Sequence, residues 1–385
     1  MTVNEINKEL LKQIQEPHHA YETYRTYLKE LFDSYTNMVE KSKDDLDQYC
    51  FIAESFDDLV GEITVYCQQL LEIYDLYMSG RIGEAVERMK DWFTPEESMF
   101  TDDVSIETPM YRARVQDSMN MTYDAKKMFH VPFEERGKIA NGRFSLAGYP
   151  CLYLGKTILA CWEEMHKPTL DNLCVAKVVL KEGISKNVIN LCWHDAIDTD
   201  YSNIDEESIG TFKLRITRLL RRYPLIMACS SRAYRPEAPF KEEYVIPQIL
   251  LLSCIGNEHV EGIAYTSTRR DNQISNDIEL HQNFVFPAQE ISDVGYCDKL
   301  ASEFRITSGL TFMEADIKSV FVSRGAVVAQ DIAEGVLSID NFEYGKTDYQ
   351  CSKFGQMEDY LSKLPLYELW RNYNAWNVQE VKENK

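Results

Sequence analysis

The chain has 385 residues, of which 44% are hydrophobic and 12% aromatic, a composition typical of an ordered globular protein. Its formal net charge of −21 at pH 7 opposes binding to nucleic acid, because such binding depends on clustered Lys and Arg side chains. The length exceeds one average domain, so it predicts two domains or one domain with large extensions.

Residues 1–100 are predicted to form helices, because their apolar residues recur at steps of three and four. Gly80 and Gly83 mark helix ends within this segment. The segment holds 21 acidic and 9 basic residues, and so more than half of the net negative charge. Its role is left open between a built-in inhibitor, a sensor and an arm for homo-oligomer formation. The acidic, non-periodic stretch 94–109 is the predicted domain boundary.

From Met110 onward the pattern changes to short strands mixed with helices. Strands are predicted at 174–180, 187–192, 262–267 and 283–287, and helices at 210–223, 244–256 and 356–364. Because strands and helices do not alternate regularly, the predicted fold class is α+β and not a doubly wound sheet. The predicted domains are an acidic helical domain at 1–100, a core domain at 108–290, and a mixed C-terminal extension at 291–385 that packs on the core.

Four arginines recur at helical spacing in the stretch LRITRLLRRYP, at positions 215, 218, 221 and 222. We expect them to form a solvated helix face that pairs with the acids of residues 198–208.

The ten cysteines are scattered without a CxxC pair, and no clustered histidines complete a zinc site. We therefore expect buried thiols in a reducing compartment and no metal. The first residues lack an apolar signal region, and no run of 18 apolar residues occurs. These features predict a cytoplasmic protein without a membrane partner.

Common catalytic motifs such as GxGxxG, HExxH and GxSxG are missing from the sequence. What remains is Arg143 in a glycine-containing turn, Tyr153 in the strand-like CLYLG, and Glu163 on the helix TILACWEEMH. Arginine suits phosphate and carboxylate, so an anionic small molecule is the expected ligand. Glu163 and Glu164 point about 100° apart on a helix, so they cannot flank one bond as a glycosidase pair would.

Five segments in order resemble the RES domain family, over roughly residues 108–290. They are MYRAR (Met110–Arg114), GRFSLAGYPCLYLG, ILACWEEM with Ala160 and Glu163, YVIPQIL with Pro247 and Gln248, and GIAYTSTR with Gly262, Tyr265, Ser267 and Arg269. Two departures are Phe144, where the family commonly has Trp, and the long segment between Glu163 and Tyr244.

This resemblance implies an ADP-ribosyltransferase-like core and an enzyme that consumes NAD+. The reaction would be hydrolysis or phosphorolysis of the nicotinamide–ribose bond, and many relatives are toxins that have an antitoxin or immunity partner. Carried over by motif, the catalytic residues would be Arg143, Tyr153, Glu163 and Ser267. The NAD+-binding residues would be Arg112, Arg143, Tyr153 and Tyr265, with no further cofactor.

The chemistry of these residue types agrees with that implication. Arginines can bind the pyrophosphate of NAD+, and the face of Tyr153 can stack on the cationic nicotinamide. A carboxylate such as Glu163 can stabilise the positive charge that develops on the ribose. Two other functions remain open: a protein mono-ADP-ribosyltransferase with the same residues, and a sensor that binds a nucleotide or a partner through a degenerate fold of this type.

Overall fold

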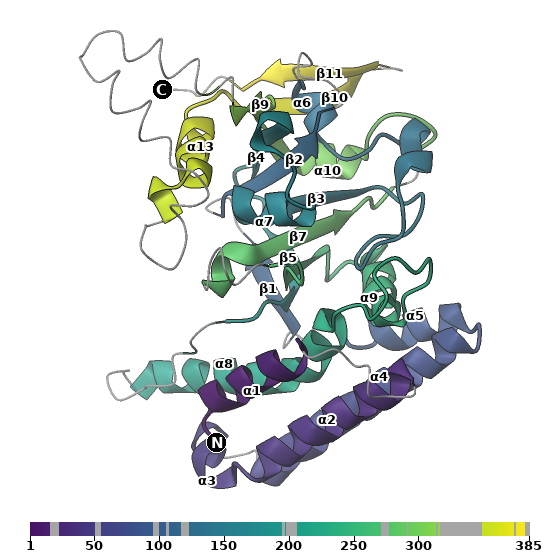
Figure 1. Ribbon diagram of the computed structural model, residues 1–385, viewed down its shortest axis with the longest axis vertical. Helices are drawn as coiled ribbons and strands as arrows, with labels where there is room; N and C mark the ends of the chain where they lie inside the picture. The colour runs from purple at the N-terminus through teal and green to yellow at the C-terminus, as the bar shows by residue number, and fades with distance from the viewer. Residues whose placement is uncertain are drawn as a thin grey trace. The chain divides into compact units, whose positions relative to one another are not determined.

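The computed structural model describes residues 1–15, 23–50, 55–94, 100–104, 108–116, 123–194, 197, 206–270, 277–290, 292–312, 315, 349–372 and 375–381 (Figure 1). Its contacts divide the chain into two compact units. The first unit contains residues 1–102, 141–146 and 188–261, and the second contains 103–140, 147–187 and 262–385. Each unit thus combines three separate stretches, whereas the sequence suggests three consecutive domains.

The first unit is built mainly from helices. They are α1 (Val3–Gln13), α2 (Tyr24–Glu40), α3 (Lys43–Leu46), α4 (Phe56–Met78), α5 (Ile82–Lys90), α8 (Glu206–Ser230) and α9 (Val245–Cys254). Thr2 and Ser55 cap α1 and α4 with reciprocal hydrogen bonds to Glu5 and Asp58, which satisfies backbone N–H groups at both helix starts. The helical prediction for residues 1–100 is confirmed for the described part of that segment.

The apolar stripes of these helices face one another. In Figure 1, α2 lies along α4, and their buried residues include Leu28, Leu31, Leu59 and Ile63. The buried Tyr35 of α2 donates its hydroxyl to the Leu220 carbonyl of α8 at 2.6 Å. Helix α2, near the N-terminus, therefore contacts α8, which lies far along the chain.

Two arginines of α8 are buried, which corrects the expectation of a solvated face. Arg221 Nε lies 2.5 Å from Glu62 of α4, and Arg222 lies 3.1 Å from Asp102. Each arginine is only 8% exposed, because α8 packs on α4. The acids of residues 198–208, the expected partners, have side chains outside the described residues.

The second unit contains an antiparallel sheet. Its strands are β2 (Met110–Val115), β3 (Cys151–Gly155), β4 (Leu173–Leu180), β6 (Gly262–Thr266), β7 (Gln282–Pro287), β8 (Phe304–Ile306), β9 (Leu310–Thr311), β10 (Tyr367–Asn372) and β11 (Ala375–Glu380). The order is β6-β7-β3-β2-β4-β8-β10-β11, with β9 also on β4. Strands β1 (Thr101–Val104) and β5 (Lys186–Leu191) each span the boundary between the units.

Short helices accompany this sheet: α6 (Ala125–Met128), α7 (Ile158–Glu164), α10 (Asp298–Glu303) and α13 (Lys353–Ser362). On one face, Tyr111 and Ala113 of β2 join a core cluster with Ile158 and Leu159 of α7 and Phe354 of α13. Residues two apart on a strand share a face, so this is the α7 face of the sheet.

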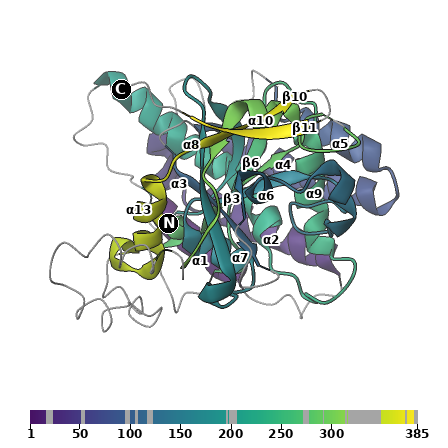
Figure 2. The ribbon, with the colours of Figure 1, turned by 90° about the horizontal axis from the view of Figure 1, so that it is seen from above.

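The C-terminal segment contributes strands to this same sheet. The predicted helix at 356–364 is confirmed as α13, but β10 and β11 were not predicted. Figure 2 shows these two strands lying along each other, and their register runs from Tyr367 opposite Glu380 to Asn372 opposite Ala375. The α+β class is confirmed, whereas the ADP-ribosyltransferase-like core stays a prediction.

Candidate functional site

Helix α7 is fixed at its start by its own cap residue, Thr157, and by Glu358 of α13. Thr157 caps it by accepting from Ala160 N–H at 3.0 Å, and its hydroxyl donates to the Leu280 carbonyl at 2.5 Å. Glu358 of α13 accepts from Ile158 N–H at 2.7 Å. A Cβ on Gly155 would lie 2.7 Å from both Cys161 Sγ and the Thr157 carbonyl, so only glycine permits this close approach of β3 to α7.

Glu163, the acid that the sequence favours, is buried against a histidine. His281 Nδ1 lies 2.6 Å from Glu163 Oε2, and the side chains of both residues are 0% exposed. His281 ends the short 3₁₀ helix η7 (Ile278–His281) just before β7. Its Nε2 has no hydrogen-bond partner among the described residues. The pair joins the C-terminal end of α7 to the start of β7.

Glu164, the next residue, lies in a more open polar cluster. Asn283 Nδ2 donates to Glu164 Oε1 at 3.3 Å, and Arg269 Nε lies 3.6 Å from Glu164 Oε2. The Glu164 side chain is 30% exposed and that of Arg269 is 43% exposed. This carboxylate is therefore accessible to solvent, whereas that of Glu163 is not.

The backbone that follows α7 adopts an unusual conformation. His166 and Lys167 have φ values of 63° and 55°, in the left-handed region that non-glycine residues rarely occupy. His166 Nδ1 lies 3.1 Å from Arg269 Nη1, and the charge of Arg269 lowers the pKa of His166. Such strain costs free energy and is common at functional sites.

Two tyrosines lie on the α7 face of the sheet together with Asn283. Tyr153 pairs with Val285, and Tyr265 pairs with Asn283. Directly opposed residues of antiparallel strands point to the same face, and so do residues two apart on one strand. Since Asn283 contacts Glu164 of α7, Tyr153 and Tyr265 belong to this face.

Ser267 is buried beside the same cluster. Its backbone N–H donates to the His281 carbonyl at 2.8 Å, and its Oγ accepts from Arg269 N–H at 3.1 Å. Ser267 thus shapes the turn that carries Arg269, the residue facing Glu164.

Arg143 belongs to the first unit, whereas the other predicted site residues belong to the second. Its guanidinium donates to the carbonyls of Cys229 and Ser231, at 2.8 and 2.7 Å, where α8 ends. The ring of Tyr244 lies 4.9 Å from its Cζ atom. In this unit Arg143 therefore binds the free carbonyl groups of a helix C-terminus.

Arg112 is buried on β2, and its Nη1 donates to the Tyr153 carbonyl at 2.8 Å. Its side chain alternates with those of Tyr111 and Ala113, so it lies on the face of the sheet opposite α7.

The structure thus brings Tyr153, Tyr265, Ser267 and the two glutamates together in the second unit. Sequence analysis missed His281, Asn283 and His166, and it left Arg269 without a role. A usable signal was the polar pair Gln282-Asn283 inside a strand that is otherwise apolar. Within the described ranges, no group of three His, Cys, Asp or Glu side chains could hold a metal ion.

A separate open cavity lies in the first unit along α4 and α5. It is lined by acidic side chains together with Tyr66 and Trp92, and none of the candidate residues lines it.

Nine cysteines of the described residues are buried free thiols, which confirms the expectation of buried thiols for these nine. No helix in the described part of the chain has both the length and the apolar character that crossing a membrane requires.

Comparison with known proteins finds a relative from Bacillus subtilis (strain 168) that is named "Putative toxin YopC". It is 31% identical over an alignment 271 residues long, and this alignment covers 66% of this chain and 60% of the relative. The chain therefore spans less than two thirds of the relative's length. No family model matches the chain, and no solved structure matches it significantly.

Proposed function

We propose that this chain is a growth-arresting toxin that cleaves the nicotinamide–ribose bond of NAD+. The observation that carries the proposal is the partly exposed carboxylate of Glu164, held beside Arg269 and Asn283 on the face that also bears Tyr153 and Tyr265. The toxin role is supported by the name of the Bacillus subtilis relative.

The reaction requires a negative group near the ribose, since its transition state resembles an oxocarbenium ion. A carboxylate aimed at this charge is the usual means of stabilisation. Glu164 is 30% exposed and can meet a substrate, while Glu163 is enclosed with His281. We therefore assign substrate contact to Glu164 and the positioning of α7 to Glu163.

Tyr153 and Tyr265 provide the aromatic part of the site. The nicotinamide ring of NAD+ is cationic and is attracted to the face of a tyrosine by about 0.5–2 kcal/mol. Once the bond breaks, nicotinamide leaves as a neutral molecule and this attraction is lost, which favours product release. The acceptor of ADP-ribose would be water or phosphate, and an antitoxin or immunity protein would be the partner.

The test is NAD+ turnover by the purified full-length protein, with nicotinamide and the ADP-ribose product separated by chromatography. Glu164→Gln should lower kcat by about 100-fold, the usual loss when one electrostatic group is removed. Glu182→Gln is the matched control, since Glu182 is an exposed glutamate of the same unit. Turnover with and without phosphate separates hydrolysis from phosphorolysis.

Absence of nicotinamide release by folded wild-type protein would overturn the proposal. In cells, induction of the chain should stop growth and lower NAD+. Normal NAD+ levels after strong induction of soluble protein would count equally against it. Label transferred from NAD+ to protein, without free ADP-ribose, would indicate mono-ADP-ribosylation by the same residues.

A further inference from the structure

The open cavity of the first unit is a groove with the length of a short peptide. Its volume is about 920 Å³, and its lining residues belong to α4, to the end of α5 and to the two residues that follow α5. On α4 they run from Asp57 to Gln69, at steps that return to one face of the helix. At 1.5 Å per residue this is about 18 Å of helix axis, the length of about five extended residues.

The walls of the groove are mainly acidic. Among the described residues that line it, the charged ones are the acids Asp57, Asp58, Glu62 and Asp91 and one base, Arg88. A surface of this charge favours a positively charged ligand.

The acids differ in how far they are neutralised by the chain itself. Asp57 lies 3.2 Å from Lys43, and Glu62 lies 2.5 Å from Arg221. Asp91 is exposed, and it has no ion-pair partner within the described residues. Asp91 is therefore the carboxylate of the groove that is most available to a cation.

Trp92 adds a hydrogen-bond donor to the wall of the groove. Trp92 is only 5% exposed, because its ring packs on Tyr66 and Phe100, with centroid distances of 5.0 and 5.2 Å. Its indole N–H has no hydrogen-bond partner in the described part of the chain, and the nitrogen is not sealed from solvent. Because an indole N–H can only donate, a ligand that satisfies it must supply an acceptor.

Gly61 leaves open space in the wall that α4 provides. Glycine is among the least favourable residues in a helix interior. A Cβ at Gly61 would meet no heavy atom of the described residues within 4 Å, so packing within this part of the chain does not require glycine. A missing side chain at this place allows the backbone of another molecule to approach the helix closely.

We propose that this groove binds an extended, basic peptide segment of a partner protein. A Lys or Arg side chain of the segment pairs with Asp91, and a backbone carbonyl accepts from the Trp92 N–H. The backbone of the segment crosses α4 at Gly61, and an apolar side chain rests on Val65, which is 47% exposed. A helical segment fits less well, since its carbonyls are already bonded. A metal ion or a protonated polyamine matches the charge but brings no acceptor.

The experiment is calorimetric titration of the full-length protein, and it does not depend on NAD+ cleavage. The probe is a hexapeptide of alternating Lys and Leu, capped at both ends so that its termini carry no charge. Spermidine supplies a similar charge without carbonyl groups, and the hexapeptide with Glu in place of Lys reverses the charge.

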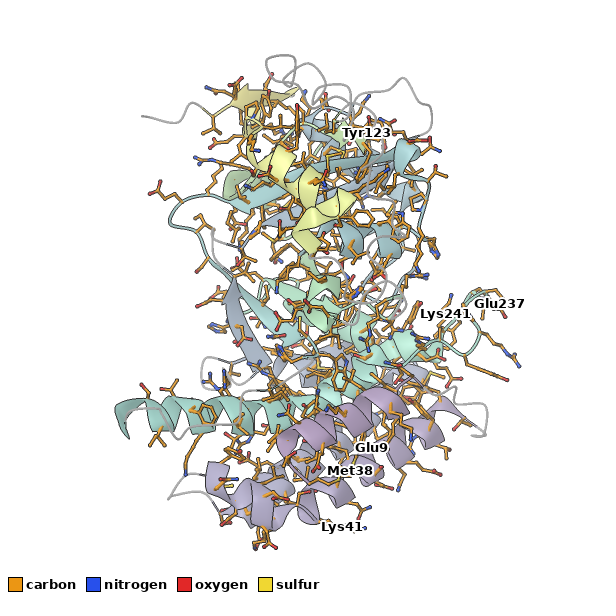
Figure 3. All side chains as sticks on the ribbon, turned by 60° about the vertical axis from the view of Figure 1, so that its left-hand side comes forward. Glu9, Met38, Lys41, Tyr123, Glu237 and Lys241 are labelled. Atoms are coloured by element: carbon orange, nitrogen blue, oxygen red, sulfur yellow. The ribbon has the colours of Figure 1, made fainter. Side chains whose placement is uncertain are left out.

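Three variants remove one feature of the groove each: Gly61→Ala, Asp91→Asn and Trp92→Phe. The control for the first is Gly83→Ala, at a glycine of α5 that does not line the groove and whose Cβ would also meet no atom within 4 Å. The control for the charge is Glu9→Gln. Glu9, labelled in Figure 3, is an acid of α1 in the same unit and does not line the groove.

Gly61→Ala should weaken binding of the Lys–Leu peptide about tenfold, because its methyl group fills the space of the peptide backbone. Asp91→Asn and Trp92→Phe should each weaken it about threefold, through loss of an ion pair and of a hydrogen bond, and each control by less than about twofold. Urea unfolding should show Gly61→Ala to be at least as stable as wild type, since alanine favours the helix. Weaker binding by this variant is then not a loss of folding.

Three results would overturn the proposal. The first is absence of Lys–Leu peptide binding to folded wild type, or equally tight binding of the Glu–Leu peptide. The second is spermidine binding as tight as that of the peptide, which would identify a free organic cation as the ligand. The third is equal peptide binding by wild type and Gly61→Ala.

Discussion

Glu163 and His281 form a wholly buried pair, with 2.6 Å between Glu163 Oε2 and His281 Nδ1. The pair connects helix α7 to the residue that precedes β7, and the His281 carbonyl also accepts from Ser267 N–H. One histidine therefore links three of the segments that carry the candidate site.

Replacing His281 by Ala should strongly destabilise the protein, because it removes the imidazole that lies 2.6 Å from the buried carboxyl of Glu163. Breaking a buried pair from one side typically costs about 3–5 kcal/mol. Urea unfolding gives this free energy, and His259→Ala, at an exposed position, is the control. Equal free energies of unfolding for the two variants would mean that the Glu163–His281 pair does not stabilise the fold.

The two adjacent glutamates should separate stability from activity. Glu163→Gln should lower the free energy of unfolding by about 1–3 kcal/mol, because it replaces the buried carboxyl that contacts His281 with an amide. Glu164→Gln should leave it almost unchanged and lower kcat for NAD+ cleavage. Both quantities are measured on the same preparations. The reverse pattern, with Glu163→Gln stable but inactive, would support the sequence-based choice of Glu163.

Ser267→Ala should raise KM for NAD+ and lower the free energy of unfolding only slightly. The variant loses the hydrogen bond from Arg269 N–H to Ser267 Oγ, which is worth about 0.5–1.5 kcal/mol, and so loosens Arg269 beside Glu164. Steady-state kinetics measure the effect, and Ser302→Ala on the exposed side of α10 is the control. An unchanged KM would show that the turn does not depend on this hydroxyl.

Glu358 should make stability depend on pH. Burial raises the pKa of Glu358 from 4.5 to about 7, so the folded state holds its proton more tightly than the unfolded state. Its contribution is complete below pH 4.5 and is lost as pH rises toward 7. At 1.36 kcal/mol per pKa unit, the loss is about 3 kcal/mol.

The variant Glu358→Gln lacks this titration but can still accept from Ile158 N–H. Urea unfolding at pH 4.5 and pH 8 should show the variant gaining about 3 kcal/mol relative to wild type at the higher pH. A constant difference between the two proteins across this range would refute the assignment.

Arg143→Lys should destabilise the first unit by about 2 kcal/mol. Lysine cannot donate to the carbonyls of both Cys229 and Ser231 in the fork geometry of arginine. Arg235→Lys, at an exposed position of the same unit, is the control. If kcat per folded molecule is unchanged in Arg143→Lys, Arg143 supports α8 and takes no part in catalysis.

Much of the local structure could be predicted, because hydrophobic periodicity decides it. The apolar steps of residues 3–13 and 56–78 gave helices, and the apolar run at 174–180 gave the central strand β4. The strands β10 and β11 were missed because their strand character depends on pairing with each other and with β8. The alternation of stretches of the chain between the two units depends on contacts between residues far apart in the sequence, and local patterns do not contain this information.

The candidate site was predictable only in part for the same reason. Motif order suggested Tyr153, Glu163 and Ser267, but it could not decide which of two adjacent acids faces solvent. That choice depends on His281, which is 118 residues away from Glu163 and reaches it through the pairing of β7 with β3.

The hydrogen bond from Ile158 N–H to Glu358 also sets a delay during protein synthesis. Ile158 and Glu358 are 200 residues apart, and translation adds about 5–20 residues per second. Glu358 is therefore made roughly 10–40 s after Ile158. A nascent chain cannot form this hydrogen bond at the start of the helix that carries Glu163 and Glu164 until this interval has passed.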